Sequence, residues 1–387
     1  MQVESARERM VFIDAMRGLA IIFMALDHVR DFFGVTPFAL LDLKQTTPAW
    51  FVTRYITHVC APIFVFLAGC SAWLYGQTVS KRALSHYLAT RGLWLIFLEC
   101  TFISLSWGAL LGGVVSLQVI WVLGLSMVLL AALQYLPRWA IGALAVLLIA
   151  GHNLLDGWHS KDFGQWGWLW SVLHEPAFHP GAIEGSGVYV AYPLLPWLGV
   201  MLAGYFCAPF LQGDAGLRQR RLLAAGGVLL LAMLLLRAGN WYGDPQPWQA
   251  QARGALYTVF SFLNFEKYPP SLLYLCITLG LSAWMLAALA RINPARLAWL
   301  TVYGRVPMFF YLLHLPMIHI GAQIWAILRY EQLSGWNYAN VPAPQDYEPS
   351  LLFVYLVWLG YLLVLYFACR WYGALKRRKP NSWLRYV

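Results

Sequence analysis

The sequence has 387 residues, of which 60% are hydrophobic and 11% are charged. Soluble domains carry about 25% charged residues, so this composition excludes a soluble domain and indicates a protein that crosses the membrane several times. The net charge of +10 lies in short basic clusters between apolar runs. Because that distribution is typical of membrane topology, we expect a lipid bilayer and no nucleic acid as partner.

About ten apolar stretches are long enough to span a bilayer. They cover residues 11–31, 52–75, 92–111, 114–134, 139–155, 189–210, 222–239, 270–290, 306–328 and 351–372. Most of the 27 Lys and Arg residues fall in segments that are cytoplasmic when the N-terminus is inside, which predicts an even number of helices and both termini in the cytoplasm. We therefore expect an all-α, polytopic membrane helix bundle. It forms a single membrane-embedded domain, residues 1–387, with short cytoplasmic tails at about 1–10 and 373–387.

The first apolar stretch carries Asp14, Arg17, Asp27 and His28. Arg17 and His28 stand eleven positions apart in RGLAIIFMALDH, so on a helix both project from one face, roughly 16 Å apart along the axis. Charged groups are expensive inside a membrane and usually face a protein or water-filled interior, which indicates a functional path. The structural alternative is an ion pair between Asp14 and Arg17 that fixes helix packing.

Later spans add a short list of polar residues at membrane depth. Glu99 lies mid-span in LWLIFLECTF and is expected to face the bundle interior, and Gln118 lies early in the fourth span. Arg305 opens the ninth span, which also holds His314 and His319 in YGRVPMFFYLLHLPMIHI. For His314 we leave two roles open, a place in the site or a hydrogen bond that joins neighbouring helices.

The outer loop at about 152–188 is rich in Trp and holds four of the nine His residues. Its Trp residues, Trp168 among them, suit either the aromatic belt of a membrane interface or a carbohydrate acceptor that stacks on flat rings. Metal-ligating side chains are also present in and next to this loop, namely His152, Asp156, His159, His174, Glu175 and His179. Their spacing matches no compact ligand motif, so we expect no metal.

Another outer loop ends in NFEKYPP, where Lys267 and Tyr268 precede Pro269 and Pro270. Proline suits the first turn of a helix, which places Lys267 at the outer mouth of the bundle. We therefore expect Lys267 and Tyr268, together with Trp168, to bind an acceptor.

Six segments in order carry a family resemblance. They read IDAMRGLAIIFMALDHVRDFF, APIFVFLAGCSAWLYG, LQVIWVLGLSM, YPLLPWLGVMLAGY, EKYPPSLLYLCITLG and YGRVPMFFYLLHLPMIH. From about Arg9 to Tyr372 the chain resembles a bacterial membrane family grouped with the heparan-α-glucosaminide N-acetyltransferase catalytic domain. The Arg-x10-His arrangement of Arg17 and His28 also resembles the hallmark of the broader transmembrane acyltransferase superfamily.

The resemblance implies a multi-pass enzyme of the bacterial inner membrane. Such an enzyme takes an acyl group, expected to be acetyl, from cytoplasmic acetyl-CoA or another acyl-CoA and delivers it to an outer-face acceptor, expected to be a glycan. The lysosomal family member differs from this chain, because it has Asn where His28 stands and its catalytic His lies farther along the following loop. The acceptor is therefore not carried over, and it need not be a sugar.

The residues themselves suit acyl transfer. Near the outer surface His28 is placed to take a proton from an acceptor hydroxyl or amine and return it to the CoA thiolate. We expect Asp31, one turn on, to hold the other ring nitrogen of His28, whereas Asp27 points about 100° away and suits a pair with another helix. The residues expected to bind the donor are Arg17, Asp14, Glu99, Gln118, Arg305 and His314.

Two alternatives stay open. Direct transfer is favoured over an acyl-His intermediate, because the chain has no Ser or Cys nucleophile motif. Intramembrane Asp, Glu, Arg and His residues would also suit a proton- or ion-coupled transporter. The sequence leaves open whether the chain forms a homo-oligomer.

Overall fold

The structure is a computed structural model that describes residues 2–333, 343–344 and 346–379, with side chains from Val11 onward. The end of the C-terminal tail predicted at 373–387 lies outside the described residues. The chain divides into two compact units. Unit 1 consists of Met1–Cys60, Ser106–Gly108 and Arg291–Val387, and unit 2 consists of Ala61–Leu105 and Ala109–Ala290.

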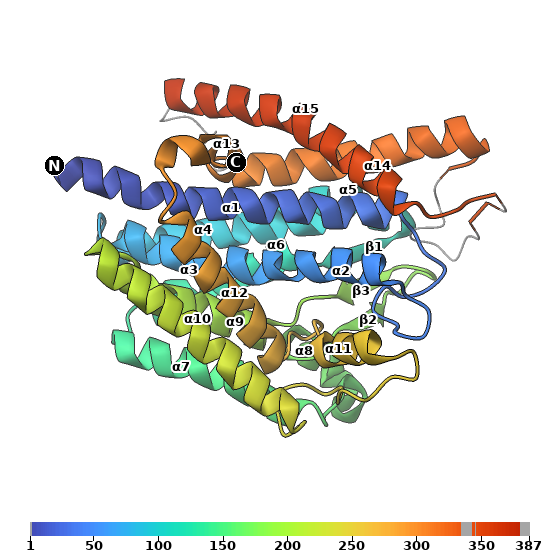
Figure 1. Ribbon diagram of the computed structural model, residues 1–387, viewed down its shortest axis with the longest axis horizontal. Helices are drawn as coiled ribbons and strands as arrows, with labels where there is room; N and C mark the ends of the chain where they lie inside the picture. Colours follow the sequence, from blue (N-terminus) through green and yellow to red (C-terminus); the bar gives the residue numbers. More distant parts are fainter. Residues whose placement is uncertain (1, 334–342, 345, 380–387) are drawn as a thin grey trace. The chain divides into compact units, whose positions relative to one another are not determined.

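Helices dominate both units (Figure 1). Unit 1 holds α1 (Gln2–Phe33), α2 (Pro48–Ile56), α13 (Ala298–Gly304), α14 (Pro307–Tyr330) and α15 (Leu351–Arg378). Unit 2 holds most or all of α3 (Cys60–Gly76), α4 (Lys81–Leu98), α5 (Ser104–Ser106), α6 (Val119–Leu133), α7 (Arg138–Gly151), α8 (Gly167–Leu173), α9 (Leu194–Cys207), α10 (Ala215–Ala238), α11 (Ala255–Leu263) and α12 (Leu272–Leu289). The predicted all-α polytopic bundle is confirmed.

Among the described residues, eight helical segments are long and apolar enough to cross a membrane. They are Pro48–Gly76, Lys81–Ser106, Arg138–Leu155, Leu194–Leu211, Ala215–Ala238, Leu272–Leu289, Pro307–Tyr330 and Leu351–Arg378. The shorter α6 is apolar as well, and α1 is the charged first stretch that carries Asp14, Arg17 and Asp27. Each of the ten predicted stretches therefore contains a helix.

Two of the predicted helical spans begin as β-strands in the structure. The stretch predicted at 114–134 opens as strand β1 (Val114–Leu117), and the stretch predicted at 189–210 opens in strand β3 (Gly187–Val190). With β2 (Ala177–Pro180) they form a sheet of order β1-β3-β2, in which β1 runs parallel to β3 and β2 antiparallel to it. Because one residue separates the end of β1 from the start of α6 and three residues separate the end of β3 from the start of α9, the sheet links the starts of these two helices.

Close backbone contact joins α1 to α13 in unit 1. A Cβ atom at Gly18 would lie 2.1 Å from the carbonyl oxygen of Leu300, and one at Gly304 would lie 1.8 Å from that of Asp14. Both distances are far inside van der Waals contact, so only glycine permits this approach. Small residues commonly allow such close helix packing in membranes.

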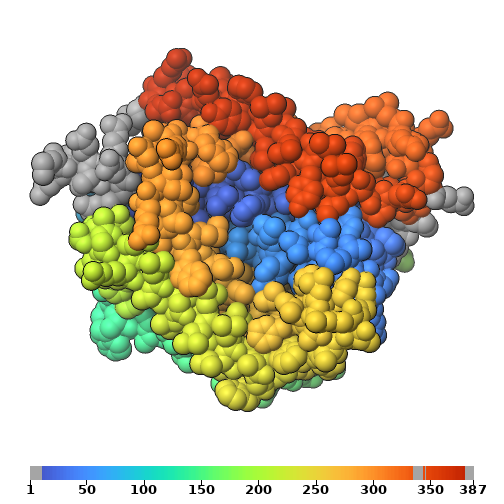
Figure 2. All heavy atoms as spheres, in the orientation of Figure 1, coloured from blue at the N-terminus to red at the C-terminus, as the bar shows by residue number. Residues whose placement is uncertain are grey.

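Helices α14 and α15 also pack within unit 1 (Figure 1). Side chains of α15 donate hydrogen bonds to main-chain oxygens of its neighbours, from Trp358 Nε1 to Ile22 at 2.9 Å and from the Tyr361 hydroxyl to Met317 at 3.0 Å. The other side of α15, red in Figure 2, exposes a row of large apolar side chains. The row comprises Leu352, Leu356, Leu359, Leu363, Phe367 and Trp371. An apolar stripe of this length suits contact with lipid.

Candidate functional site

Two histidines from distant parts of the chain meet in unit 1. His28 lies near the end of α1 and His314 lies within α14. His28 Nδ1 and His314 Nε2 are 2.7 Å apart, a short hydrogen bond, and the two rings are nearly parallel. His314 is completely buried and His28 is partly buried.

The main chain of α14 decides which nitrogens carry protons. His314 Nδ1 lies 3.0 Å from the carbonyl oxygen of Phe310 and 2.8 Å from that of Tyr311. A carbonyl oxygen only accepts, so Nδ1 of His314 carries the hydrogen and Nε2 of the neutral ring is an acceptor. His28 must then donate from Nδ1, which leaves Nε2 of a neutral His28 as the basic nitrogen.

Aromatic rings surround this histidine pair. Trp107 meets the His28 ring edge-on with the ring centroids 5.1 Å apart, and Phe32 stacks on Trp107 at 5.4 Å. His319 packs on Phe32 and donates from Nδ1 to the Ser106 carbonyl oxygen at 2.8 Å. The ring contacts hold His28 in one orientation.

The two aspartates beside His28 have other partners. Asp27 Oδ1 accepts from Arg54 at 2.7 Å and from the Thr57 hydroxyl at 2.7 Å, and it lies 2.6 Å from Arg30 Nη1. Asp31 accepts from Arg30 at 2.7 Å. The expectation that Asp31 holds the second ring nitrogen of His28 is corrected, because His314 takes that place. Asp27 links α1 to α2.

Arg17 lies toward the other end of α1, beside two charged residues. Arg17 Nη1 pairs with Asp14 Oδ1 at 3.0 Å, and Arg305 Nε lies 3.8 Å from Asp14 Oδ2. One carboxylate therefore faces two guanidinium groups. Arg17 and Asp14 are partly buried, whereas Arg305 is 55% exposed. The cluster keeps a net positive charge.

Glu99 and Gln118 belong to unit 2 and lie at the first turn of α6. Glu99 is fully buried in a single π-helical turn, Glu99–Ile103, and its Oε2 accepts from the backbone N–H of Trp121 at 2.9 Å. A carboxylate at a helix N-terminus satisfies free N–H groups and interacts favourably with the helix dipole. Gln118 donates to the Ser116 hydroxyl at 3.2 Å. These contacts are structural, and donor binding by either residue stays a prediction.

The residues predicted to bind the acceptor lie in the loops of unit 2. Lys267 is buried, with its Nζ 5.0 Å from the centre of the Tyr268 ring, whereas Trp168 is 51% exposed on α8. The structure brings Lys267 and Tyr268 together, and acceptor binding stays a prediction.

A partly buried acidic pair, Asp244 and Glu266, supports this segment. Asp244 accepts from the Ser271 hydroxyl at 2.7 Å and from the Glu266 N–H at 2.9 Å. Glu266 Oε1 in turn accepts from the N–H groups of Lys267 and Tyr268 at 3.0 and 2.9 Å. Burial raises the pKa of both carboxyl groups, against the opposing effect of these hydrogen bonds. The network fixes the backbone at Lys267 and Tyr268.

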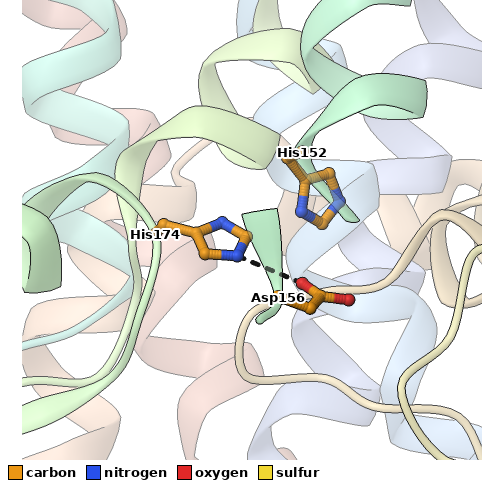
Figure 3. Close-up of side chains that lie close together, drawn as sticks. All are labelled: His152, Asp156 and His174. Atoms are coloured by element: carbon orange, nitrogen blue, oxygen red, sulfur yellow. Dashed lines mark hydrogen bonds and ion pairs between the residues drawn. The ribbon is translucent and has the colours of Figure 1, made fainter. Parts of the chain in front are cut away.

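Three of the potential metal ligands in the Trp-rich loop also meet. His152, Asp156 and His174 point toward one another in Figure 3, with one ligand atom of each within 4.8 Å of the others. His159 does not join them, because its Nδ1 pairs with Glu175 at 2.9 Å. The sequence spacing gave no sign of this cluster, since 18 positions separate Asp156 from His174.

Comparison with known proteins identifies the family. Residues 9–241 match the family model described as "Heparan-alpha-glucosaminide N-acetyltransferase, catalytic". The match covers α1 from Arg9 onward, with Arg17 and His28, and it includes the π-helical turn with Glu99 and the Trp-rich loop. No curated protein matches the chain. Since the family model covers more than half of the sequence, the chain belongs to the heparan-alpha-glucosaminide N-acetyltransferase catalytic family, a family of membrane acetyltransferases.

Proposed function

We propose that the protein transfers an acyl group, acetyl first of all, from cytoplasmic acyl-CoA to a hydroxyl or amine at the outer face of a bacterial inner membrane, with His28 as general base. A glycan is the acceptor class that we propose. The observation that carries the proposal is the hydrogen bond between His28 and His314, because it orients the His28 ring and favours the neutral tautomer with its hydrogen on Nδ1, in which Nε2 is basic.

The proposed reaction has two steps at one nitrogen. Nε2 of His28 takes the acceptor proton while the acceptor oxygen or nitrogen attacks the thioester carbonyl carbon. The tetrahedral intermediate then collapses, the carbon–sulfur bond breaks, and the CoA thiolate receives the proton from Nε2. No group on the protein is acylated. His314 keeps the His28 ring in the required tautomer throughout and acts as a positioning residue.

Charge and position support a donor role for Arg17. The donor is anionic, and Arg17 and Arg305 together outweigh the charge of Asp14. Arg17 lies on the same face of α1 as His28, about three turns nearer the cytoplasmic end in the predicted orientation. A guanidinium group binds phosphate through two parallel hydrogen bonds, so Arg17 is suited to hold the CoA part of the donor.

The proposal predicts a selective loss of turnover in His28→Ala. Purified protein is supplied with acetyl-CoA and a glycan-containing membrane extract, and released thiol is measured. His28→Ala should lose turnover by about 10²-fold or more, the usual effect of removing a general base, while acetyl-CoA binding and folding persist. His86→Ala is the matched control, because His86 is exposed on α4 outside the site. Wild-type turnover in folded His28→Ala would contradict the proposal.

His314 allows a test of the tautomer argument. In His314→Gln the side-chain amide oxygen can still accept a hydrogen bond from Nδ1 of His28, whereas in His314→Phe no acceptor remains. We expect kcat to fall about tenfold or more in His314→Phe, equivalent to about 1.4 kcal/mol, and to recover in part in His314→Gln. KM for acetyl-CoA should stay unchanged in both. Equal kcat values for Phe and Gln variants would remove the positioning role.

The same assay separates an enzyme from a transporter. A transporter would move a solute across the membrane of proteoliposomes without consuming thioester. In that case the wild type would release thiol only at the rate seen without protein, and His28→Ala would not change this rate. Mass spectrometry of surface glycans and lipids, from cells with the wild type, with His28→Ala and without the protein, would then identify the acceptor.

A further inference from the structure

The three-residue cluster in the outer part of unit 2 is built from two helices and the turns that follow them. His152 comes directly after α7, and Asp156 directly after the turn His152–Leu155. His174 comes directly after α8. His174 Nε2 lies 3.1 Å from Asp156 Oδ1, and the His152 ring lies beside the same carboxylate (Figure 3).

Burial leaves imidazole nitrogens of this cluster without partners. His152 and His174 are each only 2% exposed. Within the described residues, neither ring nitrogen of His152 makes a hydrogen bond of standard geometry, and Nδ1 of His174 makes none. A buried polar group without a hydrogen bond costs about 1–3 kcal/mol. Asp156 bonds one ring nitrogen of His174, and the Pro270 backbone lies beside the His152 ring, but these contacts do not satisfy every ring nitrogen, so the cluster can take a further ligand.

We propose that His152, Asp156 and His174 bind a divalent transition-metal ion, with Zn²⁺ as the best match. Two imidazole nitrogens and one carboxylate oxygen are a common zinc ligand set, and a fourth position is left for water. Imidazole ligands argue against Ca²⁺ and Mg²⁺, which prefer oxygen. Ligand atoms around tetrahedral zinc lie about 3.3 Å apart, so small side-chain rotations bring the present atoms, within 4.8 Å of one another, into place.

Neighbouring groups already orient these ligands. Asn153 donates to Asp156 Oδ2 at 2.8 Å, which leaves Asp156 Oδ1 directed at the cluster. The side-chain oxygen of Asn153 accepts from the Leu272 N–H at 2.9 Å. The backbone of Pro270 interacts with the His152 ring. Outer contacts of this kind fix the ring and carboxylate orientations in metal sites.

The position of the cluster indicates a structural role for the ion. It joins the end of α7 to the end of α8, and through Asn153 to the first residue of α12. The ion would therefore hold the Trp-rich loop beside the segment that contains Lys267 and Tyr268. This inference does not depend on the proposed acyl transfer.

Metal content of the full-length protein tests the site. The purified protein is loaded with Zn²⁺ and freed of excess ion, and its zinc content per chain is measured by elemental mass spectrometry. We expect about one Zn²⁺ per chain in the wild type and in His159→Ala, and loss of the ion in His152→Ala and His174→Ala. His159 is the matched control, because it lies in the same loop but is 49% exposed and pairs with Glu175.

Two measurements on the unaltered chain guard against variants that fail to fold. Zn²⁺ should raise the thermal unfolding temperature of the wild type relative to chelator-treated protein, and Co²⁺ should give the visible absorption bands of a tetrahedral site. Absence of stoichiometric Zn²⁺ together with absence of both signals would overturn the proposal. Equal zinc in the wild type and in a folded His152→Ala, His174→Ala double variant would overturn it as well.

Discussion

The orienting partner of His28 is a neutral ring rather than a carboxylate, and this has a chemical consequence. His314 accepts the hydrogen bond from Nδ1 but supplies no negative charge. In the proposed reaction the imidazolium form of His28 is therefore held in place without a full counter-charge beside Nδ1. Such a group returns its proton readily, which suits a base that must protonate the departing thiolate within the same turnover.

Substitution of Arg17 tests the other end of the proposed path. Arg17→Lys keeps the charge but loses the planar group that makes two parallel hydrogen bonds. If Arg17 holds the donor, we expect a higher apparent KM for acetyl-CoA and a smaller change in kcat at saturating donor. Steady-state kinetics over a range of acetyl-CoA concentrations measures both. Arg82→Lys is a suitable control, because Arg82 is exposed near the start of α4.

The ion pair between Arg17 and Asp14 provides the competing explanation. If Arg17 only fixes the helix through this pair, Arg17→Lys should be mild. The exchange of the two residues, Asp14→Arg with Arg17→Asp, should then restore much of the activity at unchanged donor affinity. Such a rescue would assign Arg17 to structure alone.

At the residue scale, sequence reasoning could place side chains on one helix but could not pair them across helices. The shared face of Arg17 and His28 follows from helix geometry. The contact of His28 with His314 spans 286 positions, and no local pattern encodes it. Helix spacing places Asp31 one turn from His28, but the Asp31 carboxylate pairs with Arg30, and His314 is the partner of the His28 ring.

At the scale of elements, the close packing of α1 on α13 depends on two glycines. Gly304→Ala places a methyl group against the Asp14 carbonyl oxygen, so the helices must separate. Overpacking typically lowers the free energy of unfolding by about 1–3 kcal/mol. We therefore expect the thermal unfolding temperature of the purified Gly304→Ala protein to fall below that of the wild type. Gly360→Ala is the matched control, because no atom lies within 4 Å of a Cβ at Gly360 in α15. Equal unfolding temperatures for the two variants would contradict the packing argument.

Apolar runs identify the helices well and the strands badly. Length and hydropathy were enough to locate each of the ten predicted stretches, since a membrane helix must satisfy its own backbone hydrogen bonds. Val114–Leu117 reads as the start of an apolar span, but it pairs with Gly187–Val190. That pairing joins segments about 70 residues apart, and β-structure of this kind depends on tertiary context rather than on intrinsic preference.

At the scale of the whole molecule, basic residues and helix number together predict the orientation. Among the described residues there are eight membrane-length segments, and if α1 and α6 also cross, the set is even and we expect the two termini on one side. The last turn of α15 carries Lys376, Arg377 and Arg378. Positive residues beside a span are usually retained in the cytoplasm, so we expect this end to be inside.

Reporter fusions test this orientation directly. A reporter fused after Lys379 should be active only as a cytoplasmic protein, and one inserted near Gly164 should be active only outside. Gly164 is a suitable insertion point, because it is exposed and no atom lies within 4 Å of a Cβ built on it. Binding of acetyl-CoA by the fusions is the control for folding. A cytoplasmic reporter at Gly164 would overturn the helix count, and with it the direction of acyl transfer, since the Trp-rich loop would then face the side from which the donor comes.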